Sequence, residues 1–422
     1  MSRQRIAIVG SGITGMACAR FLGKQHDITV FEKDDRIGGH SNTVMVTDGA
    51  DQIPVDTGFM VYNETTYPLL TRVFNELDVA TKPTSMSFSV QHVGDGLEFN
   101  GGSVNLLFGQ RRNLWNPRYW RMLARIARFN RETVEELANP AYGDLSLQEY
   151  VAARGYGNDF LRWYLSPMAA AVWSSPPDRI DEFPAHTLMR FWHNHGFLGL
   201  DTQHPWRTVS GGSRRYVEKL VAPFEKNIHR NSGVEAVSLV ANGVRITIDD
   251  GSTHDFDKVV LASHGDQSLA LLDDPTPLES ELLACFRYQP NEAVLHTDPS
   301  FMPRTRRCWA SWNYRIDRAG RHATHYWMNE LQGVSDREQY FVSINPPVPP
   351  AEGSVKKKLH YEHPLFDRKA VAAQDRLPEL HQAGDSTGRY FCGAWQRYGF
   401  HEDGLWSAVN VCRQILGRDP WH

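Results

Sequence analysis

Short apolar runs and a helical pattern alternate at the start of the chain. Residues 5–9 and 28–31 are apolar runs with the length of buried parallel strands. Between them, residues 16–22 have the apolar spacing of a helix. A strand, a helix and a second strand in this order predict a βαβ unit, and we therefore expect an α/β fold.

Further strand patterns lie in the second half of the chain. Residues 231–237 start a strand meander that continues through residues 244–248, and residues 257–263 return as a buried strand. Residues 389–395 form another strand and turn by the same criteria. We expect the last helix at about residues 406–416.

A glycine motif follows the first apolar run directly. The sequence Gly10-Ser11-Gly12-Ile13-Thr14-Gly15 stands between that run and the helix, and Glu32 ends the second strand 22 residues after Gly10. In this context Gly10 makes a tight turn, Gly12 lets a pyrophosphate approach the backbone, and Gly15 lets helix and strand pack closely. The helix N-terminus offers free N–H groups to phosphates, and a carboxylate at Glu32 can accept hydrogen bonds from ribose hydroxyls. The unit therefore predicts a dinucleotide site.

A second glycine pair follows the acid. Gly38 and Gly39 come soon after Glu32 and let the chain pass close to the pyrophosphate and the ribityl region, and Gly58, before Phe59, is a place where the backbone can approach an isoalloxazine ring. The chain holds one GxGxxG motif, so we expect no separate NAD(P)H-binding domain and no rapid reduction by NADH or NADPH.

With these motifs the chain resembles the flavin amine oxidase superfamily, which includes amine oxidases, protoporphyrinogen oxidases and carotenoid desaturases. In that family the element acid–x3–Arg–x–Gly–Gly belongs to FAD binding, so the resemblance implies FAD as cofactor. It covers the whole chain and implies a discontinuous Rossmann-type FAD-binding domain with an inserted α+β substrate domain of mixed sheet and helix. We expect the FAD-binding domain in residues 1–64, 208–275 and 375–422, and the substrate-binding domain in residues 65–207 and 276–374.

The resemblance also assigns cofactor contacts outside the glycine motif. In the family the backbone at the position of Val234 touches the adenine, and the N-terminus of the last helix lies under the pyrimidine edge of the flavin, where its positive end stabilises the reduced ring. The complete set of expected FAD-binding residues is Gly10, Ser11, Gly12, Ile13, Thr14, Gly15, Glu32, Lys33, Gly39, His40, Gly58, Phe59, Val234, Ala262, Gly393, Glu402, Asp403 and Leu405.

Candidate catalytic residues are few, because in flavin oxidation the ring itself takes the hydride and the protein supplies position and polarity. We expect His401 and Glu402 at the flavin edge, one of them moving a proton, and Tyr62 on the substrate side of the ring. The alternative is that His401 and Glu402 only set the loop, and His195 and Glu292 stay open as bases. No third ligand is placed by spacing near His193 and His195, so no metal is expected.

Two departures from the family pattern disfavour amine oxidation. Classical amine oxidases carry a lysine on a substrate-domain strand, at a position where this chain has Glu292, and Gly393-Ala394 replaces the usual Gly–acid pair. Five segments instead resemble a narrower group, the bacterial FAD-binding proteins associated with cyclopropane or methyl fatty acid synthases and furan fatty acid formation. These segments are residues 173–176, 295–298, 311–314, 326–329 and 399–404.

The narrower resemblance implies an FAD-dependent desaturation of a methyl-branched fatty acyl chain on a phospholipid. The alternatives are an FAD-dependent oxidase of an amine or another small molecule, and a non-catalytic flavin-binding accessory subunit of a lipid-modifying enzyme. The expected partners are a lipid or apolar small-molecule substrate and a fatty acid methyltransferase. The oligomeric state stays open.

An arginine-rich segment points to a membrane. Residues 110–131 contain seven Arg and no acid, and the expected helix at residues 115–131 carries apolar side chains spaced 4, 3, 4 and 3. These are Trp115, Tyr119, Met122, Ile126 and Phe129, flanked by Arg118, Arg121, Arg125 and Arg128. A basic amphipathic helix can lie on an anionic bilayer, whereas the alternative is a helix packed on the substrate domain with a solvated Arg face.

Composition and charge narrow the remaining classes. The 422 residues are 41% hydrophobic and 22% charged, as in a globular enzyme, and the net charge of -4 indicates no nucleic-acid partner. No apolar run reaches the length of a membrane span, and no signal peptide is expected. Five scattered cysteines favour a reduced, cytoplasmic protein, with the inner face of the membrane as a second expected location.

Overall fold

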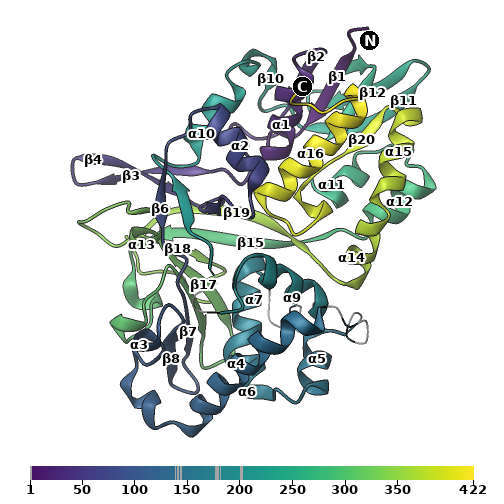
Figure 1. The fold of residues 1–422 in the computed structure, drawn as a ribbon. Coiled ribbons are helices and arrows are strands. Elements are labelled where there is room, and N and C mark those ends of the chain that lie inside the picture. Colours follow the sequence, from purple (N-terminus) through teal and green to yellow (C-terminus); the bar gives the residue numbers. More distant parts are fainter. Residues whose placement is uncertain are drawn as a thin grey trace.

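The computed structural model describes residues 2–137, 139, 142, 145–175, 180, 182–199 and 203–422. It has two regions, and both chain termini lie in the upper one in Figure 1. The upper region contains a parallel sheet covered by helices, and the lower region contains a large mixed sheet and a group of helices. The expected α/β fold with an inserted α+β region is therefore confirmed.

The parallel sheet of the upper region is assembled from distant parts of the chain. Its strand order is β10-β2-β1-β14-β20, and all four neighbouring pairs are parallel. The strands are β1 (Arg5–Val9), β2 (Asp27–Phe31), β10 (Ile228–His229), β14 (Lys258–Leu261) and β20 (Arg389–Phe391). Because β1 and β20 share one sheet across most of the chain, the Rossmann-type region is discontinuous, as expected.

Helix α1 (Ile13–Leu22) packs against α16 (His401–Leu416) on this sheet. A Cβ on Gly404 would lie 2.7 Å from Oγ1 of Thr14, so the glycine permits this close crossing. The sequence placed the start of the last helix near residue 406, which is wrong. Asp403 accepts the N–H of Phe400 at 2.9 Å and caps the helix, which therefore already starts at His401.

A meander and further helices complete the upper region. The expected meander is an antiparallel sheet of β11 (Val234–Val240), β12 (Gly243–Ile248) and β13 (Thr253–Phe256). The helices are α10 (Arg214–Val221), α11 (Gly265–Ala270), α12 (Pro277–Leu283), α14 (Arg368–Asp375) and α15 (Leu377–Thr387). Side chains of α12 and α14 share a buried cluster with Ala7 and Val9 of β1, so both helices pack with the upper region.

The lower region is built on a seven-stranded sheet in the order β19-β15-β18-β17-β16-β7-β8. The pair β16–β7 is parallel and the other pairs are antiparallel. The strands are β7 (Phe88–His92), β8 (Leu97–Asn100), β15 (Arg287–His296), β16 (Trp312–Ile316), β17 (His322–Trp327), β18 (Phe341–Ile344) and β19 (Val355–Leu365). The long strands β15 and β19 reach from the lower region toward the parallel sheet (Figure 1).

Two small sheets and a set of helices surround this core. The small sheets are β3 (Thr43–Asp48) with β4 (Asp51–Asp56), and β5 (Tyr62–Asn63) with β9 (Trp206–Val209) and β6 (Thr81–Thr84). The helices are α2 (Pro68–Glu76), α3 (Val104–Leu107), α4 (Pro117–Glu136), α5 (Leu147–Ala153), α6 (Asn158–Phe160), α7 (Ser166–Trp173), α9 (Ala185–Asn194) and α13 (Met328–Gln332). Within the described ranges, none of the helices has the length and apolar character needed to cross a membrane. All five cysteines are free.

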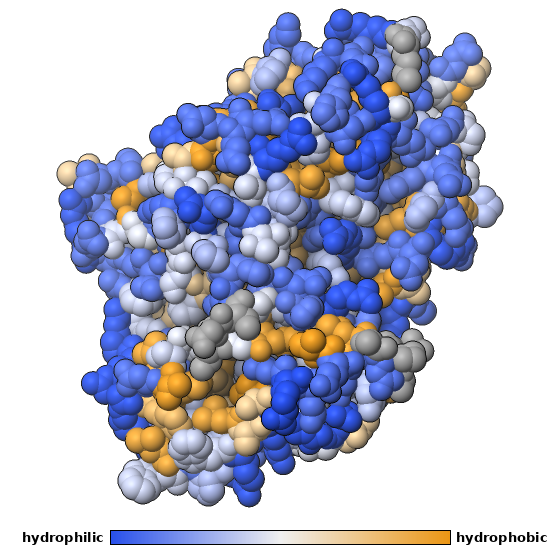
Figure 2. Space-filling model, viewed as in Figure 1, coloured by the Kyte–Doolittle hydropathy of each residue, from blue (hydrophilic) through white to orange (hydrophobic). Residues whose placement is uncertain are grey.

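Hydrophilic residues cover most of the face shown in Figure 2. Hydrophobic residues gather low in that view, over α3. In this part of the chain, Val104 of α3 keeps 63% of its surface in solvent and Leu114, a few residues later, keeps 42%.

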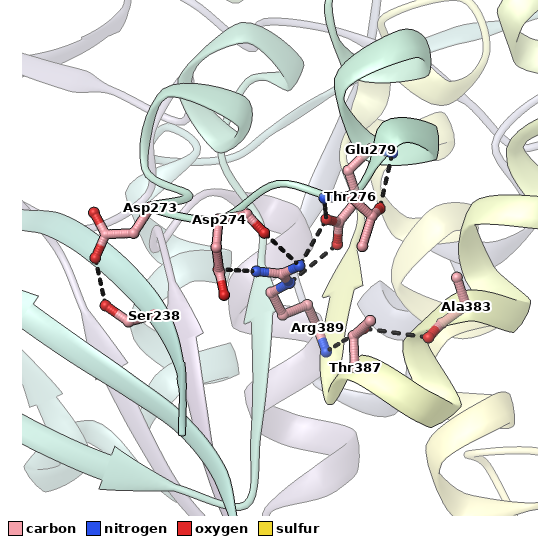
Figure 3. A network of polar contacts seen from close by, with 8 residues as sticks. All are labelled: Ser238, Asp273, Asp274, Thr276, Glu279, Ala383, Thr387 and Arg389. Atoms are coloured by element: carbon pink, nitrogen blue, oxygen red, sulfur yellow. Dashed lines mark hydrogen bonds and ion pairs between the residues drawn. The ribbon is translucent and has the colours of Figure 1, made fainter. Parts of the chain in front are cut away.

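A buried ionic network holds α12 to the edge of the parallel sheet (Figure 3). Arg389, at the start of β20, is fully buried and donates to both carboxylate oxygens of Glu279, at 3.0 and 2.7 Å, and to Asp274 at 2.7 Å. Glu279 also accepts the N–H of Thr276 at 2.7 Å, which caps α12. The charges of Arg389 and Glu279 are both removed from water, and hydrogen bonds compensate for this. Loss of one partner would therefore lower the free energy of unfolding strongly.

Candidate cofactor and substrate site

A continuous cavity of about 990 Å³ lies between the two regions. We call the part lined by the glycine motif, Glu32 and the start of the meander the nucleotide end, and the part lined by aromatic side chains from several segments the aromatic end. Within the described part of the chain, no group of three or more His, Cys, Asp or Glu is arranged to hold a metal ion. The cavity is large enough for an extended cofactor with a substrate beside it.

The three motif glycines each meet a different steric demand. Gly10 has a φ of +98°, which favours glycine in the turn after β1. A Cβ on Gly15 would lie 1.9 Å from the carbonyl oxygen of Gly10, so only glycine allows α1 to pack there. A Cβ on Gly12 would have no protein atom within 4 Å, and Gly12 lines the cavity. The space over Gly12 is therefore open to a bound group.

Glu32 links the end of β2 to the glycine turn. Its carboxylate accepts the backbone N–H of Ser11 at 3.0 Å, the hydroxyl of Ser11 at 2.6 Å, and the N–H of Asp34 at 3.0 Å. Glu32 is buried and lines the cavity. A carboxylate offers about four acceptor positions, so the side chain can still accept from a ligand hydroxyl.

Fourteen of the eighteen residues expected to bind the cofactor line the cavity. They are Gly10, Ser11, Gly12, Ile13, Thr14, Glu32, Lys33, Gly39, His40, Gly58, Phe59, Val234, Ala262 and Gly393. Gly58 meets a demand that the sequence did not reveal, because a Cβ there would lie 2.2 Å from the carbonyl oxygen of His40. The other four expected FAD-binding residues, Gly15, Glu402, Asp403 and Leu405, do not line the cavity. The expected catalytic residue Tyr62 does not line it either.

The structure corrects the expected catalytic role of Glu402. Its two carboxylate oxygens accept the backbone N–H groups of Leu69 and Leu70, each at 3.0 Å, at the start of α2. Burial raises the pKa of this carboxyl, while the two backbone hydrogen bonds and Arg397 act in the opposite direction. Glu402 therefore joins α16 to α2 and turns away from the cavity.

Tyr62 is also misplaced by the sequence-based expectation. It lies in β5, is 3% exposed, and its hydroxyl donates to Thr81 at 3.4 Å. Phe59, three residues earlier, is the aromatic side chain that reaches the cavity wall. Because β5 pairs with β9, the strand turns Tyr62 into the core instead.

His401 lies in the wall, as expected, but in the middle of a hydrogen-bonded cluster. Its Nε2 atom lies 2.9 Å from Ser41 Oγ and 3.1 Å from the Tyr216 hydroxyl, and its ring stacks on Phe59 with centroids 3.8 Å apart. Burial lowers the pKa of His401 to about 3, so the ring is neutral at physiological pH. Its Nε2 atom is engaged by these neighbours, which favours a positioning role.

The aromatic end of the cavity has a largely apolar wall. Its lining consists of Phe59, Met60, Val61, Tyr67, Met86, Val172, Trp173, Ser174, Phe191, His195, Phe197, Trp206, Trp312, Tyr326, Tyr398, Phe400 and His401. This described lining contains no Asp, Glu, Lys or Arg. Such a wall binds apolar groups well and offers little to a charged one.

His195 is a second ionisable group with a defined orientation in that aromatic wall. Its Nδ1 atom lies 2.9 Å from the carbonyl oxygen of Phe191, and its ring stacks on the Phe191 ring with centroids 3.9 Å apart. A carbonyl can only accept, so Nδ1 carries the hydrogen and Nε2 is left as an acceptor. Burial lowers the pKa of His195 to about 4, which keeps the ring neutral.

A second set of polar residues lines the cavity where β15 and β19 pass it. His40 stacks on Tyr361 with centroids 5.0 Å apart and meets the edge of His363 at 5.3 Å. Burial, and secondarily the charge of His363, lowers the pKa of His40 well below its usual value. The Nε2 atom of His40 is buried without a hydrogen-bond partner among the described residues, so a bound ligand could supply one.

Sequence reasoning missed the β19 part of this wall. Residues 360–364 line the cavity, next to Asn291 and Glu292 of β15. Asn291 donates to Nδ1 of His363 at 2.6 Å. The signal was available as a dense run of polar and aromatic residues in a strand-forming stretch, but its position beside the cavity depends on the pairing with β15.

The fold and this cavity agree with the comparisons with known proteins. The family model of the flavin containing amine oxidoreductases matches residues 13–306. The chain therefore belongs to this family of FAD-dependent oxidoreductases, and its cofactor is FAD.

The individual relatives share only a low sequence identity with this chain. A protein of Mycobacterium tuberculosis named as a flavin-containing monoamine oxidase, AofH, is 26% identical over 290 residues, which cover 66% of this chain and 61% of the relative. That protein comes from strain CDC 1551, and the protein of the same name from strain H37Rv has the same identity and coverage. The chain thus matches only about three fifths of the length of these curated relatives.

Solved structures share the fold at lower identity. A structure named as a protoporphyrinogen oxidase, from Exiguobacterium sp. 255-15, has a TM-score of 0.69 at 16% identity and covers 98% of this chain and 99% of its own. A fatty acid isomerase from P. acnes that produces CLA has a TM-score of 0.66 at 16% identity, with 97% and 98% covered. Cyclohexylamine oxidase from Brevibacterium oxydans has a TM-score of 0.68 at 14% identity, with 98% and 100% covered.

The residues present fit FAD. The open space over Gly12 at the start of α1 suits a pyrophosphate, and the acceptor capacity of Glu32 suits a ribose. Bound FAD supplies a hydride acceptor, and the aromatic end is where this chain can hold a donor.

Proposed function

We propose that the protein is an FAD-dependent dehydrogenase that desaturates a methyl-branched unsaturated fatty acyl chain of a phospholipid. The observation that carries the proposal is the aromatic end of the cavity, whose described lining is uncharged. An acyl chain has no charge to grip, so apolar and aromatic walls must orient it. Amine oxidases and a fatty acid isomerase share the fold, which leaves both substrate classes open, and the chemistry of the wall favours the apolar one.

Desaturation requires the donor to lose a hydride and a proton. In a methyl-branched alkene the allylic C–H bonds are weakened, so one carbon gives the hydride, the adjacent carbon gives the proton, and a conjugated diene forms. We assign the proton to Nε2 of His195, because the hydrogen bond from Nδ1 to Phe191 leaves that atom as an acceptor in the substrate wall. Glu402 is engaged by α2 and His401 by Ser41 and Tyr216.

Amine oxidation is the second candidate, and one observation favours it. The carboxylate side chain of Glu292 lines the cavity on β15 and could pair with an ammonium group. The curated relatives also carry the name of a monoamine oxidase. In this candidate the amine would lie toward β15, outside the aromatic end.

Anaerobic mixing separates these candidates. The FAD-loaded protein is mixed in detergent micelles with a methyl-branched monounsaturated phospholipid, with its saturated straight-chain counterpart, or with a primary amine. Bleaching of the flavin by the branched lipid alone, with a lipid product lighter by two hydrogens, supports the proposal. Bleaching by the amine alone replaces it with amine oxidation, and an oxidised flavin in all three mixtures favours an accessory subunit.

A further inference from the structure

One surface of the lower region combines exposed aromatic side chains with a dense positive charge. It is formed by α3 (Val104–Leu107), the 3-10 turn η1 (Arg111–Trp115) and the first two turns of α4. We call it the α3–α4 surface. In Figure 2 it lies low in the view, where hydrophobic residues gather over α3.

The apolar stripe predicted from the sequence does not form this surface. Tyr119, Met122 and Phe129 of α4 are fully buried, and Tyr119 and Met122 pack with Phe99 and Trp163. The stripe therefore covers the core of the lower region, which was the alternative to membrane binding. The helix also starts at Pro117, where Asn116 caps it, so Trp115 precedes α4 and is free of the buried stripe.

Other side chains of the segment point outward. Trp115 is 87% exposed, Val104 63%, Trp120 49% and Leu114 42%. Trp120 is held in place because its indole N–H donates to the carbonyl oxygen of Leu114 at 2.9 Å and its ring packs on Phe108 with centroids 5.0 Å apart. Two neighbouring tryptophans that keep this much surface in solvent are unfavourable for a protein in water alone.

The charge of the surface is positive. Residues 104–124 contain four Arg and no Asp or Glu. Arg111 and Arg112 are exposed and donate to the carbonyl oxygens of Phe108 and Gly96, which are neutral acceptors. Arg118 pairs with Asp159 at 2.6 Å, but no ion pair involves Arg111, Arg112 or Arg121 among the described residues. Their charge is therefore available to an anionic partner.

We infer that the α3–α4 surface docks on an anionic phospholipid bilayer. Indole rings favour the interface of a bilayer, where the ring is half in lipid and its N–H is in a polar layer, and guanidinium groups bind lipid phosphates. Trp115 enters the interface, Trp120 lies beside it, and the exposed arginines hold the headgroups. This inference concerns surface chemistry and holds whichever substrate the cavity takes.

Vesicle co-sedimentation of the FAD-loaded protein tests the inference. Vesicles of phosphatidylcholine alone are compared with vesicles of equal parts phosphatidylcholine and phosphatidylglycerol. We expect binding to the mixed vesicles, release by salt because screening shortens the electrostatic range, and weak binding to phosphatidylcholine. The triple variant Arg111→Gln/Arg112→Gln/Arg121→Gln should bind about 100-fold more weakly, and Trp115→Ala about 10-fold more weakly.

A matched control comes from the opposite end of the molecule. Leu239 of β11 is 39% exposed and Arg418 follows α16, so Leu239→Ala/Arg418→Gln removes one apolar and one basic side chain from the upper region. This variant should bind vesicles like the unchanged protein. All variants should keep the visible flavin spectrum, which shows that they are folded.

The outcomes are separable. No binding of the unchanged protein to mixed vesicles, or equal weakening in the control and in the α3–α4 variants, overturns the inference. Binding that persists undiminished in the triple Arg and Trp115 variants does so as well, because another surface would then bind the vesicles. If the protein binds vesicles but lipid does not bleach the flavin, the docking surface is supported and the proposed reaction is wrong. If lipid in micelles bleaches the flavin but the protein does not bind vesicles, the reaction is supported and the docking surface is wrong.

Discussion

The two ends of the cavity are built on different principles. At the nucleotide end, the turn after β1 supplies one unbroken run of lining residues, Gly10 to Thr14, and three glycines a few residues apart set the shape of the backbone. At the aromatic end, the wall is made of side chains from segments between Phe59 and His401 that come together only in the folded protein. The first end depends on local geometry and the second on tertiary packing.

This difference determines what a substitution at each end disrupts. A substitution at the nucleotide end acts through backbone space, so it removes the cofactor or breaks the turn. A substitution at the aromatic end changes what lies beside the cofactor and leaves the cofactor bound. Residues outside both ends, such as Arg389, act on the fold and affect both ends alike. The following predictions separate these three cases, in order of decreasing effect.

Gly12→Val should abolish FAD retention while the protein stays folded. No protein atom lies within 4 Å of a Cβ on Gly12, so the new side chain enters the space of the pyrophosphate alone. The measurement is the visible flavin absorbance of the purified protein together with its circular dichroism. Gly15→Val is the counterpart, since its Cβ would lie 1.9 Å from the Gly10 carbonyl oxygen and should unfold the turn itself. A yellow Gly12→Val protein would disprove the placement.

Arg389→Met should lower the free energy of unfolding by about 3–5 kcal/mol, because Glu279 would remain buried without its partner. Urea denaturation measures the change. The control is Arg245→Met, which breaks an exposed pair with Asp255 and should leave the free energy of unfolding nearly unchanged. Equal midpoints for the two variants would contradict the structural role of the buried network.

His195→Gln should slow flavin reduction by the lipid about 100-fold and leave FAD content unchanged. Glutamine can still donate to the Phe191 carbonyl but cannot accept a proton as a base. Stopped-flow reduction at saturating lipid measures the rate. The companion change Glu402→Gln should lower stability without this selective loss of rate, because Glu402 is engaged with Leu69 and Leu70. If both variants lose rate equally at unchanged stability, the assignment to His195 is wrong.

Asp403→Asn should change how stability depends on pH. Burial raises the pKa of Asp403 from the ordinary 3.8 to about 7, so the folded protein holds this proton more tightly than the unfolded chain does. Stability from this group is full below the ordinary pKa and is lost as pH rises toward about 7. Asparagine can still accept the Phe400 N–H but does not titrate. The variant should therefore gain about 1 kcal/mol or more over the unchanged protein across this window. If the difference in melting temperature between the variant and the unchanged protein is the same at every pH, the prediction is wrong.

The contrast between the two ends also explains what the sequence could predict. The strands, α1 and the glycine motif follow from local pattern, and β1 starts and ends at the predicted residues. The start of α16 was missed because a His-Glu-Asp-Gly stretch suggests a loop, and the capping by Asp403 that makes it helical is visible only in the structure.

The errors at the site have a common physical cause. Glu402 was expected beside the flavin because of its position in the sequence, but its partners Leu69 and Leu70 lie more than 300 residues away along the chain. The cavity residues of β19 were missed because their place depends on pairing with β15. Long-range pairing decides both cases, and periodicity along the chain carries no information about it.

The strand order of the parallel sheet has a consequence for biosynthesis. The ribosome synthesises β1 and the glycine turn long before β20 and α16, which close the same region. Helix α16 is complete only at residue 416. A growing chain therefore exposes a phosphate-binding turn on the ribosome long before it can enclose a cofactor. We therefore expect FAD to be enclosed only after most of the substrate region has been synthesised.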